Sequence, residues 1–220
     1  MNEELFGAIR AGDLATVDRL LTAQPYRAGA SDAAGISAVT MAAYHGQDAT
    51  LERIRAANPV LDRFEAAIVG DLPRLAELLD ERDTEPIDER SGDGFTALHL
   101  AAFFGRFRAA ELLLDRHADP NVWSSGAIHV QPLHSACAGR HDEIARLLVE
   151  HGAQPDQRQD GGVTPLHSAA LNGMRSLCDF LIAHGADPRA LTEDILSPAD
   201  LAERAGHEEL EAHLRAITAN

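Results

Sequence analysis

Apolar residues recur along this chain at the spacing of one helix face, in short segments that come in pairs. In one segment they are Leu98, Ala101 and Ala102, three and four residues apart, and the next segment contributes Leu113 and Leu114. Because each helical residue turns by about 100°, the members of each set share one face. The pattern predicts pairs of short antiparallel helices whose apolar faces are buried only when neighbouring pairs stack.

The amino-acid motifs in these segments repeat. A leucine–histidine pair ends at His99, His134 and His167, which are 35 (134 − 99) and 33 (167 − 134) residues apart. The surrounding stretches read TALHLAA, QPLHSAC and TPLHSAA, and each is followed by an apolar segment and then by HADPN, GAQPD or GADPR. A fixed period of this size predicts a repeat architecture.

These motifs resemble ankyrin repeats. The resemblance implies an all-α fold, an α-solenoid of stacked helix-turn-helix units joined by extended β-turn fingers. About six to seven units, caps included, are expected to cover the chain. The expected division is an N-terminal capping unit (1–31), a degenerate repeat (32–60), a short repeat lacking its preceding finger (61–90), three repeats (91–123, 124–158 and 159–190) and a C-terminal capping unit (191–220).

One residue marks the turn between the two helices of each unit. The predicted turn residues are Gly12, Gly46, Gly70, Gly105, Arg140, Gly173 and Gly206. Glycine suits the end of a helix because it adopts a left-handed backbone without a steric cost at Cβ. Arg140 would lose about 1–2 kcal/mol in that conformation, unless Gly139 adopts it instead.

The turn residues reveal one shortened interval. Gly46 and Gly70 are 24 residues apart (70 − 46), against 34 for the interval before (46 − 12), so about ten residues are missing. In ankyrin repeats this is the length of the extended turn, or finger, that links one unit to the next. Pro59 stands in the connection and disfavours helix at the residue before it. We expect the second unit to run almost straight into the third, with no finger there and a kink in the stack.

The residues just before each turn are predicted to face away from the local core. On the helix carrying Leu98, this places Phe103 and Phe104 on the outer side. In ankyrin repeats the corresponding side is a concave groove that binds partners, together with the fingertips. The predicted partner-binding residues are Tyr44, His45, Phe95, Phe103, Phe104, Trp123, Ala138, Leu171 and Asn172. Large exposed aromatic side chains are typical of such surfaces.

Two interpretations of these aromatic residues remain open. Either they bind a partner, with Ala138 and Gly139 leaving room for an incoming side chain beside Phe104, or they have a packing role. In a packing role they pack on one another or cover the shortened connection, or one of them leans back between neighbouring first helices. A change of Phe104 to alanine separates the two, because only packing predicts a loss of several kcal/mol.

The histidines do not form an obvious active site. The resemblance implies that His99, His134 and His167 hydrogen-bond the backbone of adjoining turns. The alternative is a metal- or small-molecule-binding enzyme that uses His129, His134 and His141 of the fifth unit. The chain contains no GxSxG, HExxH, GxxxxGK[ST] or GxGxxG motif. We therefore predict a non-catalytic protein with no metal or cofactor site.

The charge composition limits the classes of partner that the protein is expected to bind. The formal net charge is −16, and all 19 basic residues are arginine. Nucleic acid and anionic membranes are unsuitable partners for such a chain, so a neutral or basic protein partner is expected. The acidic run from Asp80 to Asp93 is a secondary candidate contact. The absence of lysine hints at a bacterial source.

The cellular compartment is predicted from the cysteines and the first residues. Cys137 and Cys178 are too few for a disulfide framework. The stretch MNEELFGAIRAGD has neither the basic start nor the apolar run of a secretory signal. A cytoplasmic monomer is expected.

Overall fold

The computed structural model describes residues 2–57, 59–80, 86–126 and 128–219. This part of the chain contains fourteen α-helices, two short 3-10 helices and no β-strand. The first helices of successive pairs are α1 (Glu3–Ala11), α3 (Ala38–Tyr44), α5 (Arg63–Val69), α7 (Ala97–Phe103), α9 (Pro132–Ala138), α11 (Pro165–Leu171) and α13 (Pro198–Arg204). The second helices are α2 (Leu14–Ala23), α4 (Asp48–Ala56), α6 (Leu72–Asp80), α8 (Phe107–Asp115), α10 (Asp142–Glu150), α12 (Arg175–Ala183) and α14 (Glu208–Thr218).

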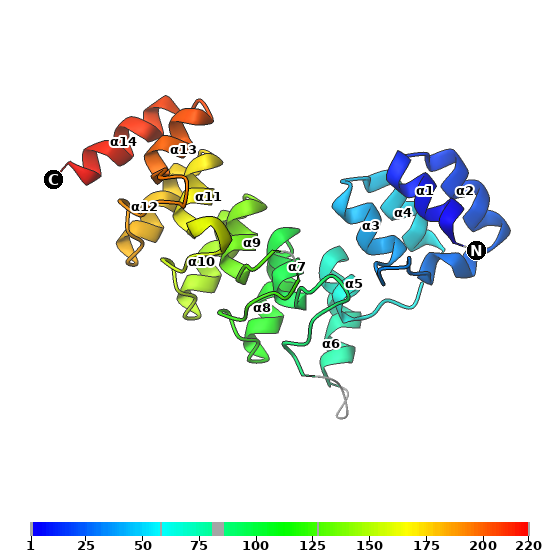
Figure 1. The fold of residues 1–220 in the computed structure, drawn as a ribbon. Coiled ribbons are helices and arrows are strands. Elements are labelled where there is room, and N and C mark those ends of the chain that lie inside the picture. The colour runs from blue at the N-terminus through cyan, green and yellow to red at the C-terminus, as the bar shows by residue number, and fades with distance from the viewer. Residues whose placement is uncertain (1, 58, 81–85, 127, 220) are drawn as a thin grey trace.

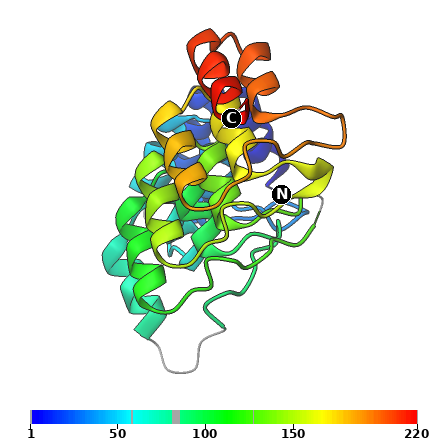
Figure 2. The same cartoon turned by 90° about the vertical axis from the view of Figure 1, so that its left-hand side faces the viewer.

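The helix pairs stack into an elongated array with the two termini at opposite ends (Figure 1). From α5 onward, the first helices pack against one another in one row, while α6, α8, α10 and α12 form a second row beside it. Seen from the end in Figure 2, the helices gather on one side and the connecting loops project on the other. The predicted all-helical solenoid is confirmed.

Local chemistry explains why the first helices are only seven residues long from α3 onward. Their starts are fixed by capping side chains, as where Thr96 accepts a hydrogen bond from the backbone N–H of His99. Proline occupies the first helical position of α9, α11 and α13, where its missing N–H costs nothing. Each helix then ends at a turn residue with positive φ.

The predicted turn residues are confirmed by the backbone. All seven have a left-handed conformation, with φ between 62° and 79°, and they are Gly12, Gly46, Gly70, Gly105, Arg140, Gly173 and Gly206. Arg140 itself has φ 65°, while Gly139 has a right-handed φ of −74°. The strain is therefore located on the arginine and is not transferred to its glycine neighbour.

The core is continuous and rich in alanine. Ala101 and Ala102 of α7 are fully buried, and so are Leu113 of α8 and Leu148 of α10. Small side chains on the first helices let neighbouring helices approach closely, and the leucines of the second helices fill the remaining space. One core therefore runs through the stack and not through each pair separately.

Regular fingers precede four of the units in the described residues. Each contains a turn closed by a backbone hydrogen bond over four residues, from Asp32 to Ile36, Ser91 to Phe95, Gln159 to Val163 and Thr192 to Leu196. The finger before α9 is longer, because there the bond joins Ser124 to Val130.

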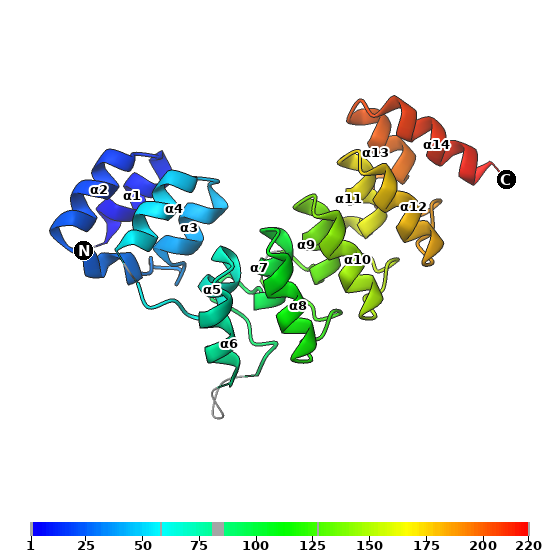
Figure 3. The same cartoon turned by 180° about the vertical axis from the view of Figure 1, so that it is seen from behind.

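The connection between α4 and α5, residues 57–62, is here called the shortened joint. Its described residues form no such turn, and the array changes direction there (Figure 1, Figure 3). With no finger in between, the finger of the second pair reaches that of the fourth. A Cβ added to Gly92 would lie only 3.4 Å from the backbone oxygen of Ala34.

Candidate partner-binding surface

Three aromatic side chains meet beside the shortened joint, and we call Tyr44, Phe103 and Phe104 the aromatic trio. The ring centroids of Tyr44 and Phe104 are 5.6 Å apart, and those of Phe103 and Phe104 are 5.2 Å apart with an edge-to-face orientation. Such spacings are favourable for aromatic pairs. The trio therefore links the end of α3 directly to the end of α7 and bypasses the helix pair between them.

A hydrogen bond strengthens this link. The Tyr44 hydroxyl donates to Oδ2 of Asp93 at 2.5 Å, and the same carboxylate accepts from the Ser91 hydroxyl through Oδ1. Partial burial of the phenol, together with the Asp93 carboxylate, raises the pKa of Tyr44 above its usual value. The hydroxyl consequently remains a donor throughout the physiological pH range.

The trio is nevertheless accessible. Phe103 is 40% exposed and Tyr44 is 39% exposed, whereas Phe104 is half-buried between them. Further along the same row of first helices, Leu171 is 46% exposed. The rings thus pack partly on one another, and the outer two still offer apolar surface to a partner.

Two of the predicted aromatic residues make their ring contacts elsewhere. Phe95 lies against His99, with centroids 5.9 Å apart. Trp123 lies against His129 and His134, at 5.6 and 6.4 Å. Both rings belong to finger segments. The residues predicted to form one apolar patch are therefore divided between the trio and two separate ring contacts on the fingers.

The remaining predicted residues differ in what they contribute. His45 and Ala138 are exposed, whereas the Asn172 side chain donates to the backbone oxygen of Cys137 at 3.1 Å and so connects adjacent units. The expected room for a partner's side chain beside Gly139 stays a prediction, but Gly139 itself has no space for a side chain of its own. A Cβ there would lie 2.3 Å from the backbone oxygen of Phe103, because the end of α7 packs directly against this glycine.

The three repeated histidines have a structural role, as the resemblance implies. Nε2 of His99 bonds the backbone oxygen of Val130, His134 bonds Gln157 and His167 bonds Leu196, each at 3.0 Å. Burial lowers the pKa of His99 and of His134 to about 4. They are therefore neutral at pH 7, and each ties its helix to the next loop.

The alternative of an enzymatic fifth unit has no support in this geometry. His134 is occupied by backbone contacts, and Nε2 of His141 bonds the backbone oxygen of Phe103 at 3.0 Å. Within the described ranges, no group of three histidine, cysteine or carboxylate side chains is placed to hold a metal ion. Complete burial raises the pKa of the Cys137 thiol, which opposes its use as a nucleophile.

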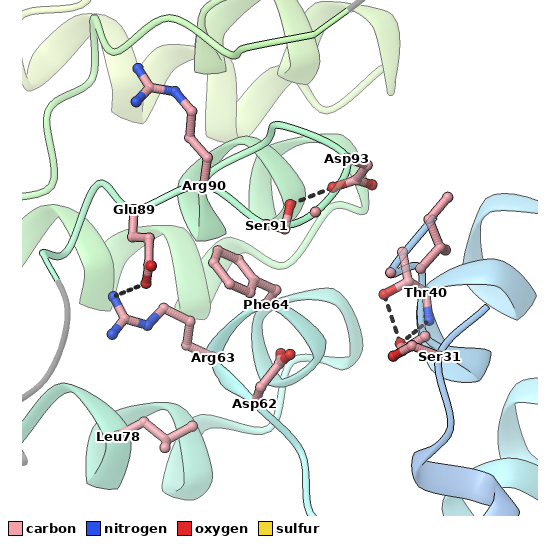
Figure 4. A pocket seen from close by; sticks show the side chains of 14 residues that line it. Ser31, Thr40, Asp62, Arg63, Phe64, Leu78, Glu89, Arg90, Ser91 and Asp93 are labelled. Atoms are coloured by element: carbon pink, nitrogen blue, oxygen red, sulfur yellow. Dashed lines mark hydrogen bonds and ion pairs between the residues drawn. The ribbon is translucent and has the colours of Figure 1, made fainter. Parts of the chain in front are cut away.

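A cavity of about 400 Å³ at the shortened joint was not foreseen from the sequence; we call it the joint cavity (Figure 4). Its wall is built from Ser31, residues 35–37 and Thr40, from residues 62–64 at the N-terminal end of α5, and from Leu78 and residues 89–93. The short interval between Gly46 and Gly70 indicated the place, but not a cavity, because its walls come from segments far apart in the chain. Of the acidic run, residues 81–85 lie outside the described part, whereas Glu89 and Asp93 line this cavity.

No helix in the described residues combines the length and apolar character needed to cross a membrane.

The stacked helix pairs define a helical repeat protein, and comparison with known families gives the particular class. A family model described as "Ankyrin repeats (3 copies)" matches residues 125–192, and one described as "Ankyrin repeat" matches residues 93–125. Residues 93–192 of the chain therefore match ankyrin repeats. Ankyrin repeats form a protein–protein interaction domain, and the family is generally a non-catalytic binding module.

Several curated proteins are similar to part of this chain. The rat "Ankyrin repeat and SAM domain-containing protein 6" is 34% identical over 104 residues, 47% of this chain. A "Putative ankyrin repeat protein" of Rickettsia felis is 39% identical over 66 residues, 30% of this chain. The mouse "Protein phosphatase 1 regulatory subunit 27" is 37% identical over 93 residues, 42% of this chain. The matches span 11%, 29% and 58% of these relatives' own lengths, less than two thirds in each case.

Proposed function

We propose that this chain is a non-catalytic protein-interaction scaffold or regulator that binds a partner protein through its concave groove and fingertips. The observation that carries the proposal is the exposed apolar surface of Tyr44 and Phe103 on a stack of short, well-capped helices. Aromatic side chains held in this way bind with little loss of side-chain freedom. Leu171 extends the apolar surface along the row of first helices.

The remaining predicted residues complete this proposed surface. His45 and Ala138 lie exposed next to the turns, and Phe95 and Trp123 are on fingers at its edge. Asn172 contributes through the position of its helix end, since its amide is engaged with Cys137. The seven-unit division of the chain, from 1–31 to 191–220, is part of the same proposal because it assigns these residues to consecutive units.

Charge and thiol chemistry add to the proposal. A net charge of −16 favours a neutral or basic protein over nucleic acid or an anionic membrane. The free, buried Cys137 and Cys178 agree with a cytoplasmic location. The protein is proposed to act as a monomer, which light scattering across a concentration series tests directly. The name of the mouse relative, a phosphatase regulatory subunit, agrees with a regulatory role.

The test compares two exposed aromatic residues. Wild-type protein, Phe103→Ala and Tyr26→Ala are immobilised and exposed to a lysate of the organism that carries the gene, and bound proteins are identified by mass spectrometry. Tyr26 is 73% exposed, lies on the 3-10 helix Pro25–Gly29 and is not a member of the aromatic trio, so it controls for a general loss of apolar surface.

The proposal predicts that a specific protein is captured by the wild type and by Tyr26→Ala but not by Phe103→Ala. Both variants should keep their free energies of unfolding within about 0.5 kcal/mol of the wild type. Equal capture by all three, or a loss of several kcal/mol for Phe103→Ala without change in capture, contradicts it and favours a packing role.

A further inference from the structure

The joint cavity has the size and construction of a ligand site. Its volume of about 400 Å³ lies within the range of roughly 300–1,000 Å³ that is common for ligand pockets. Its walls come from both sides of the shortened joint, because residues of the second and fourth fingers line it together with Asp62 and Phe64 (Figure 4).

The two cationic side chains in the wall are directed to other partners. The Arg63 guanidinium donates to the backbone oxygen of Pro86 at 2.7 Å and lies 4.0 Å from a carboxylate oxygen of Glu89. Arg90 donates through two nitrogens to the backbone oxygen of Trp123, at 3.0 and 2.8 Å. In Figure 4 both guanidinium groups extend away from Asp62 and Phe64. Neither group is aimed into the space around those two residues.

Acceptors and an aromatic ring face the remaining space. Asp62 is exposed, and it caps α5 by accepting from the backbone N–H of Glu65 at 2.8 Å. Asp93 lies across the cavity, and the half-buried ring of Phe64 is in the wall between the two carboxylates (Figure 4). Hydroxyl groups of Ser37 and Thr40 are on the remaining side. The combination of carboxylates, hydroxyls and one aromatic ring is suited to a planar cation.

We infer that the joint cavity binds the guanidinium group of an arginine side chain in the partner's bound segment. Arginine fits better than lysine because its guanidinium is planar, can donate two parallel hydrogen bonds to one carboxylate and stacks on an aromatic ring. The inference rests on the proposed function and gives the partner's chemistry: a basic segment with at least one arginine.

The joint cavity and the aromatic trio are connected through one side chain. Asp93 lines the cavity and also accepts the hydrogen bond from Tyr44. A segment that covers Tyr44 and Phe103 therefore ends within reach of the cavity mouth. Apolar side chains of the partner would contact the trio while the arginine enters the joint.

The test uses the complete chain and two small peptides, acetyl-Gly-Arg-Gly-amide and its neutral isostere acetyl-Gly-citrulline-Gly-amide. Each is titrated at low ionic strength while backbone amide shifts are followed by NMR. The expected result is saturable shifts at Gly35, Ser37, Ser91 and Gly92 with the arginine peptide. The citrulline peptide should bind about fivefold more weakly, as expected for loss of one partly exposed ion pair.

Matched cap variants identify the carboxylate responsible. Asp62→Asn keeps a good N-cap but removes the charge. It should lower the affinity for the arginine peptide about fivefold. Asp71→Asn is the control, because Asp71 caps α6 in the same way and lies outside the joint cavity. The affinity of Asp71→Asn for the arginine peptide should match that of the wild type.

The inference is overturned if the shifts map elsewhere, if citrulline binds equally well, or if the two cap variants behave alike. Should any of these occur while Phe103→Ala still abolishes partner capture, the proposed function stands and only the cavity assignment is wrong. Arginine-specific binding without any captured partner would instead overturn the proposed function and leave the cavity as an arginine site.

Discussion

The junction between α7/α8 and α9/α10 and the junction between α3/α4 and α5/α6 join similar helix pairs in different ways. In the first, His99 bonds the loop that leads into α9, and His141 bonds the end of α7. The backbones approach so closely that Gly139 has no room for a Cβ. The finger, the histidine hydrogen bonds and the close backbone packing together hold these two helix pairs against each other.

The shortened joint lacks these connections. In three other units the side chain after the turn donates to the end of the preceding first helix: Gln47 to Ile9, Arg106 to Ile68 and His141 to Phe103. The third unit has Asp71 in that place, a carboxylate that cannot donate and instead accepts from the backbone of Arg74.

The consequence is open space on both sides of the shortened joint. The joint cavity of about 400 Å³ is on one side, and a second hollow of about 610 Å³, walled in part by Leu61 and Arg74, is on the other. Tyr44 spans the gap by contacting the fourth unit. A lost finger therefore removes the local contacts between units, and a longer-range contact replaces them.

Acidification should produce the largest difference between the two kinds of junction. The folded pKa values of about 4 for His99 and His134 lie below the unfolded value of 6.5, so the unfolded chain binds more protons. Stability is then fully present above pH 6.5 and is lost as pH falls through about 4, by on the order of 5 kcal/mol. Urea unfolding at a series of pH values measures this slope.

The shortened joint should respond with the opposite sign. Glu65 occupies the histidine's position in α5, and burial raises its pKa above the ordinary value for a glutamate. At that position the folded state binds the proton more tightly, so acidification favours folding there. His134→Gln should flatten the pH slope, while Glu65→Gln should steepen it. Equal slopes for both variants and the wild type would refute the assignment.

A cavity in the regular stack should be the next largest effect. Leu148 is fully buried in α10, and Leu148→Ala should lower the free energy of unfolding by about 2–5 kcal/mol. Leu61→Ala at the shortened joint should cost less, about 1–2 kcal/mol, because the side chain borders an existing hollow. Urea denaturation of both variants measures the contrast, and equal costs would contradict it.

Glycine-to-alanine substitutions test how closely the backbones pack at the two junctions, and their expected effects on stability are smaller. Gly139→Ala places a Cβ 2.3 Å from the Phe103 oxygen and should cost about 1–3 kcal/mol through overpacking. Gly92→Ala places one at an ordinary 3.4 Å from the Ala34 oxygen and should be neutral or slightly stabilising. Thermal unfolding distinguishes them, and a destabilised Gly92→Ala would mean that the fingers at the shortened joint are as tightly packed as the regular junction.

The smallest expected effect is a gain. Arg140→Gly relieves a left-handed arginine, partly offset by the greater freedom of glycine in the unfolded chain, and should add about 0.5–1 kcal/mol. His117, with φ 68°, provides a second site where the same change should have the same sign. Urea midpoints measure both. A variant that unfolds at or below the wild-type midpoint argues against strain at that turn.

Much of the candidate site was predictable from local pattern. The outward direction of Phe103 and Phe104 followed from helix geometry, and the turn position of Arg140 followed from the repeat. The filled space at Gly139 could not be predicted, because it depends on how far two neighbouring backbones approach each other. The histidine roles came from the resemblance, and the observed backbone contacts agree with it.

The sequence by itself determined that the chain forms paired helices, where they turn, and that one finger is missing. These features depend on residues close in sequence and on a repeating period. Only the tertiary structure decided that Tyr44 bonds Asp93, 49 residues away, and that a cavity opens beside them. The reason is that the angle at the shortened joint is set by the few contacts that remain when a finger is absent, and no local pattern encodes that angle.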